Sequence, residues 1–215
     1  VTPGLARHFE RLSASGREEA VLVPLCGRTP DLAWLAEQRL QVVGVECSRR
    51  TIAKFAQEQG FELAQGDQPA PDIELTSWFA GPCTIFEGDW FEATPEVLGG
   101  SFDLAYDNGA MVVVDPARRQ DYVAVYRKVL KDKCRLLVMA PEFQESKVDA
   151  SVVALGPHSL SVAELQGLAP DFSLEVLEEE EAIGWDAYRA LRGAGVTSVT
   201  HRTVLLERHA VCYPG

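Results

Sequence analysis

The stretch Val21-Leu22-Val23-Pro24-Leu25-Cys26-Gly27 decides the fold class, because it joins a continuous apolar run to a glycine turn. A short apolar run without polar alternation is typical of a strand that is buried on both faces. Thr29, Pro30 and Asp31 follow the turn, and these residue types favour the first turn of a helix. The stretch therefore predicts a buried strand that leads directly into a helix.

The same order of strand and helix repeats along the chain. Four more buried strands are expected at 41–45, 83–87, 102–106 and 135–139, and two closing strands at 172–177 and 203–207. This alternation predicts an α/β, doubly wound, mostly parallel sheet with helices on both faces. Residues 63–79 contain a mixture of glycine, proline and polar residues and are expected to form a loop. No flexible linker divides residues 1–215, so we expect a single domain.

Composition excludes several classes of partner. The 215 residues carry a net charge of −12, which disfavours nucleic acid and an anionic membrane surface. The longest apolar runs, such as 20–26, are far shorter than a membrane span, and no charged-then-apolar leader opens the chain. The acidic run 178–181 is expected to form a solvated face or a turn.

The cysteines and histidines predict neither disulfides nor a metal site. The chain has five cysteines, an odd number that cannot all pair, and none of them forms a Cys-x-x-Cys motif. This favours reduced thiols in a cytoplasmic protein. The four histidines do not cluster with them at the short spacing of a zinc site, so no metal is expected.

A candidate ligand site lies where the predicted strands end, because doubly wound sheets bind ligands beyond the carboxyl ends of their strands. Glu46 follows Gly27 by nineteen residues, a spacing that places a carboxylate where it can bind both hydroxyls of a ribose. A solvated glutamate at a strand end is the alternative. Gly27 stands alone, without the glycine-rich fingerprint that a pyrophosphate needs, which disfavours NAD and FAD. S-adenosylmethionine, which has no pyrophosphate, fits the pattern.

Two further strand ends extend the candidate site. Asp89 could accept a hydrogen bond from the adenine amine, with Trp90 or Phe91 as an apolar wall, although Trp90 could equally pack in the core. Asp107 is the candidate base or water-orienting group, and a role at the tail of the cofactor or as a helix cap stays open. Asn108 is expected to contact the cofactor or to orient the methyl acceptor.

The chain resembles the thiopurine S-methyltransferase family in two regions. The first is made of 21–27, 34–37 and 42–46, and the second is 102–111 followed by Asp115-Pro116, Arg119 and Tyr122. The resemblance implies a seven-stranded, Rossmann-like methyltransferase fold with an antiparallel last strand. It implies S-adenosylmethionine as cofactor and S-adenosylhomocysteine as product. The cofactor contacts expected from it and from the strand ends are Leu25, Cys26, Gly27, Glu46, Asp89, Trp90, Asp107 and Asn108, with Asp107 and Asn108 also as catalytic candidates.

Two departures from the family pattern bear on the acceptor. The family's Asp-Arg-Gly is Asp107-Asn108-Gly109 here, and from the resemblance we expect the family's N-terminal lid segment to lie before residue 1. We expect a monomeric enzyme that methylates the sulfur, or selenium, of a small thiol or selenol. Because asparagine cannot depress the pKa of a thiol as arginine does, acceptors that are already ionised near neutral pH should be preferred. A halide/thiol methyltransferase and a cofactor-binding protein without activity remain the alternatives, and a nicotinamide enzyme is a distant one.

Overall fold

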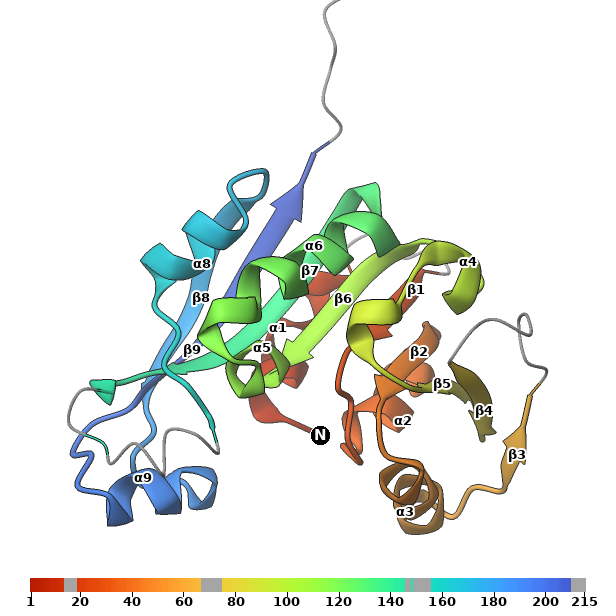
Figure 1. Cartoon of the computed structure of the whole chain (residues 1–215), viewed down its shortest axis with the longest axis horizontal. Helices are drawn as coiled ribbons and strands as arrows, with labels where there is room; N and C mark the ends of the chain where they lie inside the picture. Colours follow the sequence, from red (N-terminus) through yellow and green to blue (C-terminus); the bar gives the residue numbers. More distant parts are fainter. Residues whose placement is uncertain (14–18, 67–74, 146–147, 149–155, 210–215) are drawn as a thin grey trace, which may run out of the picture.

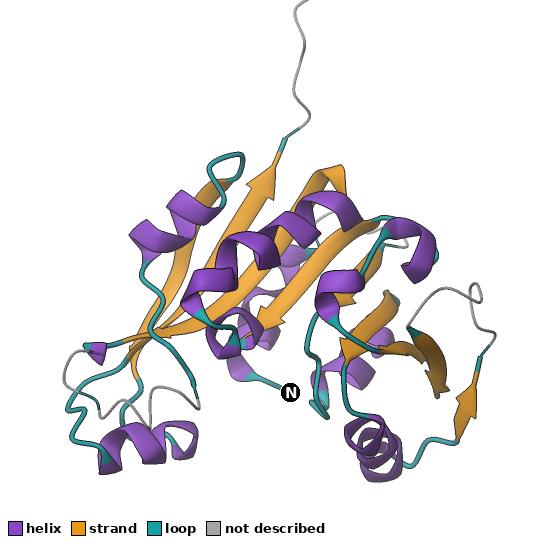
Figure 2. Cartoon of the chain, in the orientation of Figure 1, coloured by secondary structure: helices purple, strands orange, loops and turns teal. Residues whose placement is uncertain are grey.

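The computed structural model describes residues 1–13, 19–66, 75–145, 148 and 156–209. These residues form a nine-stranded sheet in the order β3-β4-β5-β2-β1-β6-β7-β9-β8, with helices on both faces (Figures 1 and 2). The strands are β1 (Ala20–Val23), β2 (Gln41–Glu46), β3 (Leu63–Gln65), β4 (Thr76–Ala80), β5 (Cys83–Glu87), β6 (Phe102–Asn108), β7 (Leu130–Glu142), β8 (Ser173–Glu181) and β9 (Thr200–Arg208). The α-helices are α1 (Pro3–Leu12), α2 (Asp31–Glu37), α3 (Arg49–Gln59), α4 (Pro95–Leu98), α5 (Ala110–Val113), α6 (Arg119–Val129), α8 (Val162–Leu168) and α9 (Arg189–Gly193). Short 3-10 turns are η1 (Trp90–Glu92), η2 (Pro116–Arg118) and η4 (Asp186–Tyr188).

The centre of the sheet is parallel. Neighbouring strands pair in parallel from β5 through β2, β1 and β6 to β7, so their carboxyl ends meet at one edge. The last strand, β9, is antiparallel to both β7 and β8. The predicted doubly wound α/β class and the antiparallel last strand are therefore confirmed.

The predicted number of seven strands is wrong, because the described residues contain nine. The two unforeseen strands, β3 and β4, lie within 63–79, where the sequence predicts a loop. β4 pairs antiparallel with β5, and β3 pairs antiparallel with β4 at the edge of the sheet. These short strands mix polar and apolar residues, so their stability comes from the pairing of β4 with β5 and of β3 with β4 rather than from a periodic pattern of their own.

The alternation of strand side chains builds two core layers, one on each face of the sheet. In β1, Val21 and Val23 pack with the leucines of α1 and α2, whereas Leu22 packs with the residues of α6 on the opposite face. All three valine and leucine side chains are at most 2% exposed. Successive residues of a strand point to opposite faces, so a strand covered on both sides must be apolar throughout. This is the physical reason for the unbroken run at 21–23.

Helix α1 was not foreseen from the sequence. Its Leu5 and Leu12 are fully buried, and it packs against β7 and β9. The sequence does hold a signal for it, because Thr2-Pro3 is a favourable helix start and Leu5 and Leu12 lie on one helical face.

The acidic run 178–181 lies in β8 and does not form a turn. Strand β8 and helix α1 are joined by ion pairs of Arg7 with Glu178 (2.8 Å) and Glu180 (2.5 Å), and of Arg11 with Glu175 (2.5 Å). The acidic residues of this strand therefore hold α1 against the sheet edge. Among the described helices, we find none of the length and apolar character that crossing a bilayer requires.

Candidate functional site

The turn after β1 is built for close approach to a ligand. Gly27 has a φ of 60°, and nothing lies within 4 Å of the position that a Cβ would take. The turn is fixed from behind, because Cys26 N–H donates to the Val45 carbonyl at 2.9 Å. Burial raises the pKa of the Cys26 thiol well above its usual range, so this thiol stays protonated near neutral pH. Gly44 of β2 leaves room for it, since a Cβ there would lie 2.7 Å from the Cys26 sulfur.

The carboxylate of Glu46 joins this turn to the next helix. Its Oε2 accepts a hydrogen bond from Gly27 N–H at 3.0 Å, and its Oε1 accepts one from Ser48 N–H at 2.9 Å. Ser48 in turn caps α3 by accepting a hydrogen bond from Thr51 N–H. Glu46 is 9% exposed, so it differs from the solvated strand-end glutamate that the sequence left as the alternative. The structure thus brings Gly27 and Glu46 together as their spacing predicts.

The loop after β5 lies beside Glu46, because Gly88 N–H donates to the Glu46 carbonyl at 3.1 Å. Asp89 is exposed and caps η1 through a hydrogen bond from Phe91 N–H at 3.0 Å. Trp90 is 3% exposed and packs against the rings of Tyr122 and Tyr126, which is the core-packing alternative. Trp90 therefore presents no wall to a ligand, and Phe91 is the more exposed aromatic residue of this loop.

Asp107 occupies a fully buried position at the end of β6. Its Oδ1 accepts hydrogen bonds from the backbone N–H groups of Ala110 and Met111, and its Oδ2 accepts them from the hydroxyls of Tyr122 and Tyr126. Burial raises its pKa, and these four hydrogen bonds partly offset that effect. This is the helix-capping arrangement that the sequence left open beside a catalytic one.

Asn108, the next residue, points the other way and is exposed. Its Nδ2 donates to the Thr2 hydroxyl at 3.2 Å, and Thr2 is fixed in turn by the buried carboxylate of Asp31. Asn108 lines a pocket of about 430 Å³ between the start of α1 and the ends of β7, β8 and β9. The other lining residues are Thr2, Pro3, Gly4, Arg7, Met139, Glu178, Glu180, Trp185, Ala187, Tyr188, His201 and Thr203.

One wall of this pocket is aromatic. The rings of Trp185 and Tyr188 are nearly parallel (19°) with centroids 6.1 Å apart, and the His201 ring lies 4.8 Å from that of Trp185. Burial lowers the pKa of His201, which keeps the imidazole neutral near neutral pH. Sequence reasoning missed this wall because it comes from segments more than seventy residues away from Asn108.

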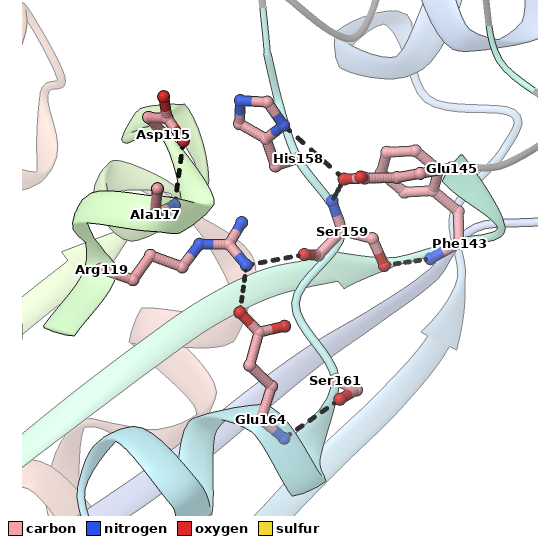
Figure 3. Close-up of polar contacts among 9 residues, drawn as sticks. All are labelled: Asp115, Ala117, Arg119, Phe143, Glu145, His158, Ser159, Ser161 and Glu164. Carbon is pink, nitrogen blue, oxygen red and sulfur yellow. Dashed lines mark hydrogen bonds and ion pairs between the residues drawn. The ribbon is translucent and has the colours of Figure 1, made fainter.

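A second polar cluster connects α6 with Ser159 and with Glu164 of α8 (Figure 3). Arg119 is 1% exposed, and its Nη1 donates to the Ser159 carbonyl at 3.0 Å and to Glu164 at 2.5 Å. Within the described part of the chain, its Nε and Nη2 find no hydrogen-bond acceptor. His158 N–H donates to the Val112 carbonyl, and the His158 ring lies 3.7 Å from a Glu145 oxygen. These contacts hold residues 158–159 and the first turn of α8 against α5 and α6.

Metal ligation has no support in the ranges described here, where no three side chains of histidine, cysteine, aspartate or glutamate are grouped to hold an ion. The candidate cofactor site consists of the backbone of the turn at Gly27 and the carboxylate of Glu46. The candidate acceptor site is the pocket beside Asn108.

The chain is similar in sequence to known methyltransferases. The thiopurine S-methyltransferase (TPMT) family matches residues 1–209. A thiopurine S-methyltransferase of Pseudomonas fluorescens (strain Pf0-1) is 32% identical over 203 residues, which is 94% of this chain and 87% of that protein. One from Aliivibrio fischeri (strain ATCC 700601 / ES114) is 32% identical over 180 residues, 84% of this chain and 78% of that protein.

Solved methyltransferases share the fold at low sequence identity. The Burkholderia thailandensis 1,6-didemethyltoxoflavin-N1-methyltransferase, with S-adenosylhomocysteine bound, matches with a TM-score of 0.59 and 18% identity over 96% of this chain and 79% of its own. The Haemonchus contortus phosphoethanolamine N-methyltransferase 2, in complex with S-adenosyl-L-methionine, matches with a TM-score of 0.64 and 13% identity over 96% of this chain and 52% of its own. These likenesses place the chain in the fold of methyltransferases that use S-adenosylmethionine.

Proposed function

Because the chain belongs to the thiopurine S-methyltransferase family, we propose that it transfers the methyl group of S-adenosylmethionine to the sulfur of a small thiol. The single observation that carries this proposal is the hydrogen bond from Gly27 N–H to the Glu46 carboxylate at 3.0 Å. It joins an open glycine turn to a carboxylate at the edge where five parallel strands end.

The residues present fit S-adenosylmethionine. Gly27 leaves open space beside its backbone, and each Glu46 oxygen accepts only one hydrogen bond from the described backbone. A carboxylate oxygen can accept two, so Oε2 keeps acceptor capacity for one ribose hydroxyl. The second position on Oε1 is held only by the Cys47 thiol at 3.6 Å, a weak donor that a second ribose hydroxyl can replace. The turn has a single glycine and therefore suits a nucleoside without a pyrophosphate.

The ends of β1, β2 and β5 then each contribute to binding the cofactor. The backbone of Leu25, Cys26 and Gly27 borders it, Glu46 binds the ribose hydroxyls, and Asp89 accepts from the adenine amine. Trp90 supports this loop from the core. Phe91 has the Arg118 guanidinium over one face of its ring, 3.7 Å from the centroid, so it offers the adenine its edge or its other face. When bound, S-adenosylmethionine supplies a methyl group on a positively charged sulfur. This sulfur leaves as a neutral thioether, which needs no proton.

The acceptor side of the reaction depends on alignment more than on acid–base chemistry. A thiol reacts as its thiolate, and orientation supplies much of the rate of an in-line displacement. We assign Asn108 the role of orienting the acceptor from the wall of the 430 Å³ pocket. The two oxygens of Asp107 are occupied by four donors, so we assign it a positioning role in the loop that carries Asn108. Acidic thiols and selenols, which lose their proton to water, suit such a site.

Calorimetric titration with S-adenosylhomocysteine and with NAD, followed by methyl transfer to a panel of thiols, hydrogen selenide and iodide, tests the proposal. We expect S-adenosylhomocysteine to bind, NAD not to bind, and aromatic thiols to be methylated. Preference for NAD contradicts the cofactor assignment. Binding without turnover on any acceptor identifies a cofactor-binding protein, and turnover on iodide alone identifies a halide methyltransferase.

A further inference from the structure

The pocket beside Asn108 has a charge pattern that bears on which acceptors it can hold. We propose that this pocket binds the methyl acceptor and ranks ring thiols by the charge of their substituent, with cationic substituents before neutral ones and anionic ones last. The inference rests on the proposed function and adds the class of acceptor to it.

The first observation concerns the one cation in the described lining. Arg7 is already bound to two carboxylates, since its Nε donates to Glu178 at 3.2 Å, and its Nη2 donates to Glu180 at 2.5 Å and lies 2.8 Å from a Glu178 oxygen. His201 is also in the lining but is neutral near neutral pH. Two carboxylates and one guanidinium leave the described lining with a net negative charge. A carboxylate or phosphate on the acceptor would find no free cation there.

The second observation is the aromatic wall. Trp185 is 40% exposed, and its ring is nearly parallel to that of Tyr188. The electron-rich faces of tryptophan and tyrosine attract cations and stack with planar rings. An aromatic wall and two carboxylates that line the same pocket are a combination that binds an organic cation, and a planar ring fits the same wall.

The third observation is the residue at the reacting end. Asn108 provides an uncharged amide, whose Nδ2 is held by the Thr2 hydroxyl at 3.2 Å. It adds no positive charge to offset Glu178 and Glu180. The lining is therefore uncharged at Asn108, where we place the acceptor sulfur, and carries its net negative charge at Glu178 and Glu180. The charge of the substituent on the acceptor then decides between acceptors.

Three product-like thioethers test the ranking without any need for turnover. They are methylthiobenzenes with a para-trimethylammonium, a para-carboxamide or a para-carboxylate group, titrated by calorimetry in saturating S-adenosylhomocysteine. We expect the cationic probe to bind about tenfold more tightly than the carboxylate, with the amide between them, after allowing for partial solvent screening of the glutamates.

Glu180→Gln removes one carboxylate from the pocket and should narrow the gap between the cationic and anionic probes severalfold. Glu175→Gln is the matched control, because it breaks the equivalent ion pair between α1 and β8, with Arg11, outside the pocket. Trp185→Ala should weaken all three probes and leave S-adenosylhomocysteine binding unchanged. Equal affinities, the reverse order, no binding of any probe, or the same effect in both glutamate variants overturns the inference.

The corresponding thiols separate this inference from the proposed function. Methyl transfer to all three at equal kcat/KM leaves the function standing and overturns the charge ranking. Ranked binding of the thioethers without methyl transfer to any thiol supports the pocket and overturns the methyltransferase assignment.

Discussion

Glu46→Gln keeps the size of the side chain and removes an acceptor at a point where both carboxylate oxygens are used. In the native chain, Gly27 N–H and Ser48 N–H each donate to one oxygen, at 3.0 and 2.9 Å. A glutamine has one carbonyl oxygen, and its amide group must face the other N–H, donor against donor. One of the two backbone groups therefore loses its partner, and a ribose would lose one of its two acceptors.

The structure sets the size of both effects. A hydrogen bond to a charged group contributes about 1.5–3 kcal/mol, and Glu46 is only 9% exposed, so solvent offsets little of the loss. We expect the free energy of unfolding to fall by about 1–3 kcal/mol. The Kd for S-adenosylhomocysteine should rise about 10- to 100-fold, since a tenfold change corresponds to about 1.4 kcal/mol.

Urea denaturation without ligand measures the first effect, and calorimetry on fully folded protein measures the second. Glu87→Gln is the control, because Glu87 is the register partner of Glu46 on β5, and glutamine can still accept the hydrogen bond from Trp78 Nε1. Lower stability with unchanged affinity would show that Glu46 only joins the turn to α3. Equal weakening by Glu87→Gln would show that negative charge at the strand ends, rather than contact with Glu46, governs binding.

Three more substitutions probe the acceptor side. Asn108→Arg should raise kcat/KM on alkyl thiols and move the rise of its pH profile lower by about one to three units, since a nearby cation lowers a thiol pKa; an unchanged profile means that position 108 does not face the acceptor. Asp107→Asn should lower the free energy of unfolding by about 3 kcal/mol or more in urea denaturation, because buried donors lose their acceptor; lost turnover at unchanged stability would favour a catalytic role. Burial alone would raise the pKa of Glu178, but hydrogen bonds from groups that include Arg7 and His8 outweigh it, so this pKa lies below its ordinary 4.5. Its contribution to stability is therefore complete above pH 4.5 and is lost as the pH falls through the lower folded-state value, and Glu178→Gln should flatten this acid limb of the stability curve.

Local sequence patterns determined the centre of the sheet. Strands β1, β2, β5 and β6 begin and end within two residues of the ranges expected from their apolar runs. The spacing of Gly27 and Glu46 also predicted that Glu46 lies at the end of the second strand, where β2 does end, because strands that are neighbours in a parallel sheet bring their carboxyl ends to one edge. The hydrogen bond between Gly27 and Glu46 follows from that placement. These features follow from periodicity and chain order alone.

Other features depended on packing between segments distant in sequence. The sequence could not decide whether Trp90 faces a ligand or the core, and the answer lies in Tyr122 and Tyr126 of α6, which pack against it. The same helix supplies the two hydroxyls that occupy one oxygen of Asp107. In the sequence, an aromatic ring or a carboxylate at a strand end looks the same whether it contacts a ligand or packs inside the protein. Only its neighbours in space distinguish these two roles.

The pocket beside Asn108 belongs to tertiary structure in the same way. Arg7 meets Glu178 and Glu180 across more than 170 residues of sequence, and no local pattern links an N-terminal helix to an acidic edge strand. The sequence determined where the central strands end, because hydrophobic periodicity is a local property. Only the folded chain decided which charges line the pocket beside Asn108, because charges act through distance in space, and that distance is set by how α1 packs against β7 and β9, next to the edge strand β8.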